Sequence, residues 1–187
     1  MVARRWNMCS MAEPLTPEVL YAGKYVELVR SGRWEYARRA HGHRAVGIIA
    51  MAAADKLILV QQYRIPLGAD TIELPAGLVG DQDAREEIET AARRELLEET
   101  GYEAQKIDYL FDGPSSAGLT DEQVDLVLAT GLRQVHAGGG VEAERITVHT
   151  VRLDELGLFL QTHRGRGVQI DFKVRLAEYF LRFRHQK

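Results

Sequence analysis

The chain of 187 residues predicts an α/β protein, an α/β/α sandwich around a mixed sheet, with a small N-terminal β-stranded segment. Strand-like runs rich in Val, Ile and Leu alternate along the chain with two or three segments of helical periodicity. The composition, 45% hydrophobic and 27% charged, is that of an ordinary globular domain. Three more short strand-like runs come first, and three strands cannot bury much apolar surface alone. We therefore expect them to pack on the main domain or on a second copy of the chain.

This pattern predicts three parts, namely a loosely ordered N-terminus at residues 1–16, a β-stranded dimerisation segment at 17–42, and the main domain at 43–187. Short strands are expected within the dimerisation segment at residues 19–22, 24–30 and 33–38. Ser31-Gly32 separates the second from the third, as in a hairpin.

The main domain should open with two buried strands that Ala54-Asp55 joins. A loop rich in Gly and Asp should then lead into a helix that Gly101 ends. A last helix is expected because apolar residues recur there at helical spacing. The strands expected are 43–53, 56–64, 71–74, 102–111, 123–130 and 146–152, and the helices are 85–100, 154–161 and 170–183.

Bulk properties exclude several classes of protein. The net charge of −3 lacks the basic excess of a nucleic-acid-binding surface. Cys9 is the single cysteine, which excludes an internal disulfide and a cysteine-ligated zinc site. The longest apolar run, residues 46–54, is too short to span a membrane, and residues 1–12 lack the apolar core of a secretory signal. A cytoplasmic enzyme is the expectation.

The end of the first helix carries a cluster of acidic residues. Glu95, Glu98 and Glu99 share one helical face, because residues three and four apart are neighbours. Like charges so placed destabilise a helix by about a few tenths of a kcal/mol per pair, and a cation between them would remove that cost. Carboxylate oxygens suit Mg²⁺ or Mn²⁺. The alternative is a solvated acidic face on an ordinary amphipathic helix.

The spacing around this cluster favours the metal site. From Gly80 the chain has five residues, Glu86, seven residues, and then Arg94-Glu95-Leu96-Leu97-Glu98-Glu99-Thr100-Gly101-Tyr102. This run resembles the Nudix box, and we identify the chain as similar to Nudix hydrolases. Glu73-Leu74-Pro75-Ala76-Gly77 resembles the segment that opens the box in the ADP-ribose pyrophosphatase or nucleoside diphosphate sugar hydrolase branch. Counted from Gly77, the distance to Arg94 is three residues longer than in that branch, so we expect a longer loop before the helix, with the role of Glu86 open.

The resemblance implies a catalytic set around the box. Glu95 and Glu99 would bind metal with the carbonyl oxygen of Ala76, and Glu98 would assist catalysis as a third ligand through water. Arg94 would brace the acidic cluster, the alternative being an ordinary solvent-exposed side chain. A catalytic base is expected in the loop after Gly138-Gly139-Gly140, whose glycines would let it move over the site. Counting back four residues from Ile146 predicts Glu142 as the base, with Glu144 as a further metal ligand or the alternative base. A polar hairpin loop without catalytic function is the other interpretation.

The resemblance also implies substrate contacts. Arg64, in Gln-Gln-Tyr-Arg-Ile-Pro, would contact a substrate phosphate, and Trp34-Glu35 would stack on and hydrogen-bond the adenine. A Trp34 packed in a dimer core is the alternative. The loop with Gly118 resembles a loop of the same branch, although Ala117 replaces the usual proline there, and Glu122 would face the terminal ribose or a metal. Leu78 completes the predicted substrate-binding residues.

A Nudix fold of this branch implies Mg²⁺-dependent or Mn²⁺-dependent hydrolysis of the diphosphate bond of ADP-ribose, which gives AMP and ribose 5-phosphate. The N-terminal strands indicate a homodimer, and the net charge and the short apolar runs indicate neither a nucleic acid nor a membrane as partner. One alternative is a hydrolase for another nucleotide sugar, such as ADP-glucose or GDP-mannose. Another is a non-catalytic sensor that binds ADP-ribose without cleaving it.

Overall fold

The computed structural model describes residues 16–41, 44–53, 55–81, 83–140 and 145–183. The chain divides into two compact units, Met1–Gly42 with Ser116–Asp121, and His43–Ser115 with Glu122–Lys187. The loop at 116–121 therefore groups with the N-terminal strands, although it follows them by more than seventy residues in the chain.

The N-terminal unit is an antiparallel sheet of β1 (Glu18–Ala22), β2 (Val26–Ser31) and β3 (Trp34–Arg39), in that order. The backbone N–H of Ala37 donates to the carbonyl of Leu119 at 2.8 Å, which fastens the loop at 116–121 to β3. Large apolar side chains remain exposed on this small sheet, namely Val19, Leu20, Tyr21, Tyr25, Val26, Leu28 and Trp34. Such a surface is typical of a sheet that packs against a partner.

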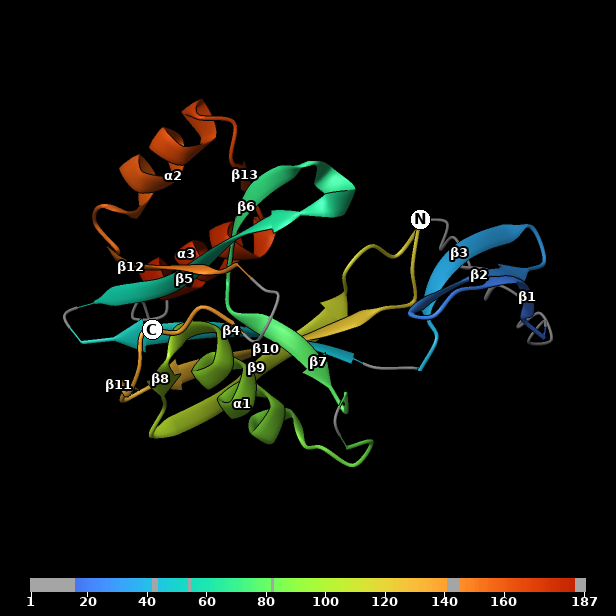
Figure 1. The fold of residues 1–187 in the computed structure, drawn as a ribbon, viewed down its shortest axis with the longest axis horizontal. Coiled ribbons are helices and arrows are strands. Elements are labelled where there is room, and N and C mark those ends of the chain that lie inside the picture. Colours follow the sequence, from blue (N-terminus) through green and yellow to red (C-terminus); the bar gives the residue numbers. More distant parts are fainter. Residues whose placement is uncertain (1–15, 42–43, 54, 82, 141–144, 184–187) are drawn as a thin grey trace, which may run out of the picture. The chain divides into compact units, whose positions relative to one another are not determined.

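The larger unit contains the remaining elements, which are labelled in Figure 1. They are β4 (Arg44–Ala52), β5 (Lys56–Arg64), the 3₁₀ turn η1 (Ile65–Leu67), β6 (Ala69–Glu73), β7 (Ala76–Val79), α1 (Ile88–Thr100), β8 (Tyr102–Glu103), β9 (Lys106–Pro114), β10 (Gln123–Thr130), β11 (Arg133–Gln134), β12 (Thr147–Arg152), α2 (Leu156–Gly165), β13 (Gln169–Ile170) and α3 (Phe172–Phe183). None of the helices described is long and apolar enough to cross a membrane.

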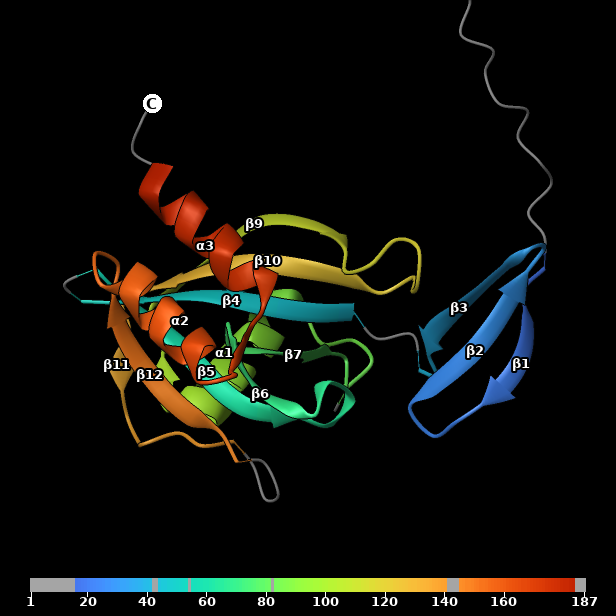
Figure 2. The same ribbon diagram turned by 90° about the horizontal axis from the view of Figure 1, so that it is seen from above.

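The main sheet is mixed and lies between two helical layers. Its order is β13-β6-β5-β4-β10-β9, with β12 paired to β5 and β7 paired to β4. β10 runs parallel to β4, while β9 and β5 are antiparallel to their neighbours. Within this unit α1 covers one face, and α2 and α3 cover the other, as Figures 1 and 2 show. The predicted α/β/α sandwich around a mixed sheet is confirmed.

β4 shows why this fold follows from the sequence. Successive side chains of a strand point to opposite faces of the sheet, so a strand covered on both faces must be apolar throughout. Ile49 and Met51 enter the core under α2 and α3, whereas Ile48 and Ala50 enter the core under α1. The run Val-Gly-Ile-Ile-Ala-Met-Ala is therefore buried almost without interruption.

Several predicted boundaries were wrong: α2 runs from Leu156 to Gly165 rather than over 154–161, and α3 begins at Phe172 rather than at 170. Three further differences have a clear physical cause. Helix α1 begins at Ile88 rather than at 85, because Asp83 holds the preceding residues in a turn: its carbonyl accepts from the N–H of Glu86 at 2.8 Å. Residues 76–79 form β7 rather than a loop, because they pair with β4. The single strand expected at 102–111 is divided into β8 and β9, since the N–H of Gln105 turns to the carbonyl of Thr130.

Candidate active site

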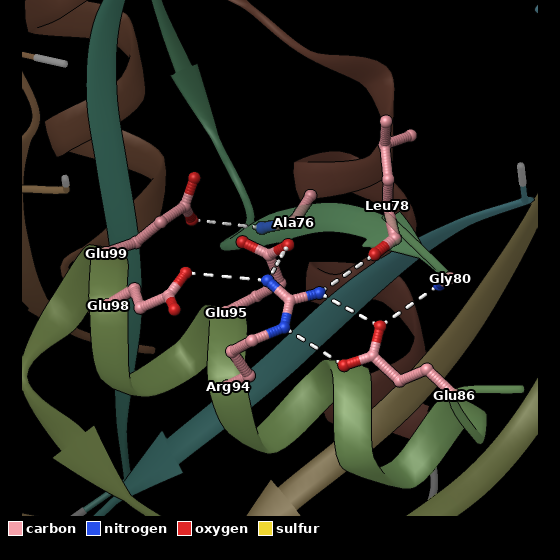
Figure 3. Close-up of polar contacts among 8 residues, drawn as sticks. All are labelled: Ala76, Leu78, Gly80, Glu86, Arg94, Glu95, Glu98 and Glu99. Carbon is pink, nitrogen blue, oxygen red and sulfur yellow. Dashed lines mark hydrogen bonds and ion pairs between the residues drawn. The ribbon is translucent and has the colours of Figure 1, made fainter. Parts of the chain in front are cut away.

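The candidate site lies where the last turns of α1 meet β7. Figure 3 shows the side chains of Glu95, Glu98 and Glu99 extending from α1 toward the strand that begins at Ala76. The helix ends at Gly101, whose N–H donates to the carbonyl of Leu97 at 2.8 Å. Residues 95, 98 and 99 thus share a face beside the strand, as helical spacing requires.

Arg94 is the centre of this arrangement (Figure 3). Its Nε and Nη2 donate to the two carboxylate oxygens of Glu86 at 3.0 and 3.1 Å. Nη2 also donates to the carbonyl of Leu78 at 3.0 Å, and Nη1 donates to Glu95 at 2.6 Å and to Glu98 at 3.4 Å. The side chain of Arg94 is only 17% exposed. One buried guanidinium therefore fastens two of the acidic side chains to β7.

These contacts shift the ionisation of both partners. The pKa of the Glu86 carboxyl is lowered, chiefly by its hydrogen bonds from Arg94 and also by the N–H of Gly80, which donates to it at 3.0 Å. The Glu86 carboxylate in turn raises the pKa of Arg94, with Glu95 contributing. Both groups stay charged at neutral pH, so the ion pair is permanent under ordinary conditions.

Gly77 is required by a close approach. A Cβ atom at this position would lie 1.9 Å from Cδ of Glu95, so any side chain would displace that carboxylate. Gly80 contributes differently, by donating its N–H to Glu86. The structure thus gives a role both to Gly77 and to the Gly80–Glu86 pair. The role of Glu86, which the sequence left open, is to hold Arg94.

The residues at the end of α1 have the chemistry of a site for a hard cation. Glu99 is 6% exposed and accepts the N–H of Ala76 at 3.0 Å, which brings it beside the backbone of β7. Carboxylate and carbonyl oxygens are the donors that Mg²⁺ and Mn²⁺ prefer. Among the described residues, no three His, Cys, Asp or Glu side chains are already arranged as metal ligands. Glu95 and Glu98 are instead turned to Arg94, so a bound cation has to compete with that guanidinium.

The glycine-rich loop is fastened to the same helix end. The N–H of Gly139 donates to the carbonyl of Glu99 at 2.9 Å, and that of Gly140 donates to the carbonyl of Glu98 at 3.1 Å. The N–H of Ile146 then donates to the carbonyl of Gly139 at 3.3 Å. Gly139 and Gly140 therefore cap the last carbonyls of α1, rather than forming a free hinge, while the N–H of Gly138 donates to Nδ1 of His136. Glu142 and Glu144 lie outside the described residues, and their roles stay predictions.

Arg64 lies at the end of β5 and pairs with Glu73 of β6. Its Nε and Nη2 donate to the two carboxylate oxygens of Glu73 at 2.7 and 2.6 Å. Glu73 raises the pKa of Arg64 most, and Glu99 adds a smaller contribution, which shows that Arg64 lies within electrostatic reach of the acidic cluster. Glu73 was not among the residues predicted for the site, although it opens the Glu-Leu-Pro-Ala-Gly segment.

The model of the NUDIX domain family matches residues 41–168 of this sequence. The chain belongs to the NUDIX domain family. That match spans the main sheet except its edge strand β13, together with α1 and the acidic cluster, and it confirms the resemblance drawn from the box.

Relatives of this NUDIX chain are moderately similar in sequence. The methanol dehydrogenase activator of Bacillus methanolicus is 36% identical over 121 residues, covering 64% of this chain and 64% of that protein. The ADP-ribose pyrophosphatase of Bacillus subtilis is 33% identical over 124 residues, covering 63% of this chain and 65% of that protein. The chain thus matches less than two thirds of the length of these curated relatives. A crystal structure of an ADP compounds hydrolase superposes with a TM-score of 0.71 at 19% identity, covering 92% of this chain and 94% of that one, which shows a shared fold.

The remaining predicted site residues are divided between the two units of this NUDIX protein. Trp34, 56% exposed, and Glu35 lie on β3 of the N-terminal unit, and Gly118 lies in the loop that groups with it. Glu122 belongs to the larger unit, where its carbonyl accepts the N–H of Ser115 at 3.0 Å. The substrate contacts expected of these four residues stay predictions.

Proposed function

We propose that the chain is a divalent-metal-dependent pyrophosphohydrolase that cleaves nucleoside diphosphates linked to a sugar, with ADP-ribose as the leading substrate. The observation that supports this most is the clamp in which Arg94 holds Glu95 and Glu98 beside Glu99 and the backbone of Ala76. A purely structural helix end does not need three partly buried carboxylates on one stripe, since like charges there weaken the helix.

Names of relatives point to the same substrate class. An ADP-ribose pyrophosphatase of Mycobacterium tuberculosis is 43% identical over 91 residues, covering 49% of this chain and 43% of that protein. A GDP-mannose pyrophosphatase of Escherichia coli is 33% identical over 130 residues, covering 65% of this chain and 64% of that protein. A nucleotide joined to a sugar through a diphosphate is common to both names, while the base and the sugar differ.

In the proposed mechanism Glu95, Glu99 and the carbonyl of Ala76 would hold Mg²⁺ or Mn²⁺, with Glu98 assisting. When bound, the cation supplies neutralisation of charge on the phosphoryl oxygens and activation of the attacking water. Arg94 keeps Glu95 and Glu98 in place, and Arg64 binds a phosphate oxygen.

The chemical step is a displacement at phosphorus. The attacking water forms a bond to one phosphorus and gives a proton to Glu142, or to Glu144 in the alternative assignment. The bridging P–O bond breaks, and its electron pair leaves with the second phosphate, so that ADP-ribose yields AMP and ribose 5-phosphate. The proposal also includes a homodimer formed through the N-terminal sheet, and stacking of the adenine on Trp34, a contact of about 1–3 kcal/mol.

A substrate panel tests the proposal. Purified protein is assayed on ADP-ribose, ADP-glucose and GDP-mannose with Mg²⁺ or Mn²⁺, beside Glu99→Gln and the control Glu89→Gln, whose carboxylate pairs with Arg93 on the exposed part of α1. We expect ADP-ribose to be cleaved fastest and Glu99→Gln to lower kcat by at least about 100-fold, because a group that organises transition-state charge is weakened. The Glu89→Gln variant should match the wild type.

The rival functions give other results. Protein that binds ADP-ribose in calorimetry and leaves it intact with either metal is a sensor. Equal rates across the three nucleotide sugars would contradict recognition of adenine by Trp34.

A further inference from the structure

The ion pair between Arg64 and Glu73 joins the last residue of β5 to the last residue of β6. In the register of this pair of strands Arg64 lies opposite Ala69, Gln62 opposite Thr71, and Val60 opposite Glu73. Arg64 and Glu73 are therefore not direct cross-strand partners. The Arg64 side chain has to reach back along the sheet, over the level of Gln62 and Thr71, to meet Glu73.

Stability of the hairpin does not account for this pair. The backbone ladder from Val60–Glu73 to Arg64–Ala69 already holds the two strands in register. Glu73 is 7% exposed, and removing a carboxylate from water carries a desolvation penalty that an ion pair often only balances. Thr71, which lies under the path of the pair, is buried with a hydroxyl that has no hydrogen-bond partner among the described residues. A hairpin selected for stability alone favours an apolar row at these positions.

The guanidinium of Arg64 is only half engaged. Of its five N–H donors, Glu73 takes one from Nε and one from Nη2. In the part of the chain that the structure describes, no protein acceptor is recorded for its other donors, and the Arg64 side chain is 43% exposed. A guanidinium whose one edge is held by a buried carboxylate is a rigid plane with its other edge available, which is the geometry that recognises a phosphate by two parallel hydrogen bonds.

Glu73 also belongs to the segment that builds the acidic site. It ends β6, and the chain then passes through Leu74 and Pro75 to Ala76, whose N–H binds Glu99. One short segment thus holds both Arg64 and Glu99. A phosphate bound to the available edge of Arg64 would therefore be positioned through the same segment that positions Glu99.

We infer that Glu73 is a positioning residue, which fixes the plane of the Arg64 guanidinium so that its remaining donors meet a phosphate oxygen of the nucleoside diphosphate. This inference rests on the proposed function. Glu73 itself does not touch the substrate, and it acts through Arg64.

The test compares binding with turnover in Glu73→Gln. Loss of the negative charge frees the guanidinium, so KM for ADP-ribose should rise about tenfold, as is typical when the partner of a ligand-binding side chain is removed, while kcat changes less than about threefold. The Kd of ADP-ribose, measured by calorimetry in EDTA, should rise by a similar factor. The control is Thr71→Val, which removes the unpaired hydroxyl beneath the pair without changing any charge, and it should keep the wild-type KM and Kd.

A double-mutant comparison in the Arg64→Met variant distinguishes a positioning role of Glu73 from a role in folding. Arg64→Met should raise Kd at least as much as Glu73→Gln does, and Glu73→Leu added to Arg64→Met should cause no further rise, because Glu73 acts through Arg64 alone. The Met–Leu pair replaces a partly buried ion pair by apolar side chains, a change that proteins generally tolerate. Thermal melting of each variant checks that it is folded.

The outcomes decide between the two proposals. A wild type that binds ADP-ribose without cleaving it refutes the pyrophosphohydrolase, while the Kd series still tests Glu73. A wild-type Kd in Glu73→Gln, a further loss on adding Glu73→Leu to Arg64→Met, or a wild type that does not bind ADP-ribose overturns the role of Glu73.

Discussion

At the scale of single residues, Arg94 and Glu86 determine how the acidic end of α1 is held. The two side chains are 17% and 7% exposed, and each is also fastened to the neighbouring strand: Arg94 donates to the carbonyl of Leu78 on β7, and Glu86 accepts the N–H of Gly80 just after it. Removing one partner of a buried ion pair leaves a charge without compensation, which costs far more than the pair itself contributes. The Glu86 carboxylate should therefore matter for folding as well as for the site.

We predict that Glu86→Ala lowers the free energy of unfolding by about 3–5 kcal/mol, measured by urea denaturation at pH 7. The pKa of Glu86 is lowered in the folded state, so its stabilisation is fully present above its ordinary value of 4.5 and is lost as the pH falls through the folded value. The difference between wild type and variant should thus shrink in acid. The exposed neighbour Glu87, whose side chain makes no capping hydrogen bond, is the control, and Glu87→Ala should stay within about 0.5 kcal/mol. Equal losses in both variants would show that the clamp does not stabilise the fold.

Helical periodicity alone was enough to predict that Glu95, Glu98 and Glu99 lie on one face, and the resemblance to the Nudix box added Arg94. Neither revealed Glu73, because the bond from Arg64 depends on the register of β5 and β6. The sequence also left the role of Glu86 open, because the spacing of the box fits when it is counted from Gly80 but is three residues too long when it is counted from Gly77. Gly77 is needed for the close approach of Glu95, and the backbone N–H of Gly80 donates to Glu86.

At the scale of elements, the C-terminal end of α1 and the glycine-rich loop form one hydrogen-bonded unit. The last carbonyls of a helix lack partners within the helix, and here Gly139 and Gly140 supply them. Gly138 precedes them with a φ of +72°, and its Cα lies so near α1 that an added Cβ would be 2.5 Å from the carbonyl carbon of Thr100.

Gly138→Ala should therefore destabilise the protein by at least about 1–3 kcal/mol, since it combines a left-handed backbone with a steric overlap. The control is Gly157→Ala in α2, where an added Cβ meets no atom within 4 Å. This second variant should be stabilised by up to about 1 kcal/mol, the difference in helix propensity. Thermal or urea unfolding measures both, and a Gly138→Ala variant as stable as the wild type would show that the cap adds nothing.

Elements with clear periodicity were the easiest to predict. The strand at Gln123–Thr130 was predicted at its observed bounds, and the other long strands to within a few residues. β7 was missed because Ala-Gly-Leu-Val carries no strand signature, and its pairing depends on the neighbouring β4. The start of α1 was placed too early because the turn at Asp83 is set by hydrogen bonds rather than by residue preference.

At the scale of the whole molecule, the N-terminal sheet exposes large apolar side chains that a monomer would leave in contact with water. Val26 and Leu28 alternate on one face of β2, and both are exposed. The homodimer stays a prediction, and this face offers the means to test it.

We predict that wild-type protein elutes with twice the mass of one chain in light scattering, and that Val26→Glu with Leu28→Glu converts it to a monomer, because buried carboxylates without partners are costly at an interface. Leu158→Glu, which adds a charge at an exposed position of α2, should leave the mass unchanged. A wild type that is already monomeric would contradict the dimer.

Sequence patterns were sufficient for the fold class, since strands apolar on both faces require helices on both sides of a sheet. They did not show that residues 116–121 group with the N-terminal strands, because that association joins segments far apart in the chain.

The stretch between Val79 and Glu86 has a consequence for how such proteins diverge. The clamp at Glu86 and the cap at Gly101 hold the two ends of α1, so the stretch before Glu86 can change length with little effect on the helix where the hydrogen bonds from Gly80 to Glu86 and from Glu86 to Asp83 are kept. Lengthening a surface loop destabilises a protein only slightly, since each doubling of the loop length costs about 0.6 kcal/mol of loop-closure free energy. Pattern searches that fix the distance from Gly77 to Arg94 will overlook proteins like this one, and the same stretch offers protein engineers a position for inserting a foreign peptide.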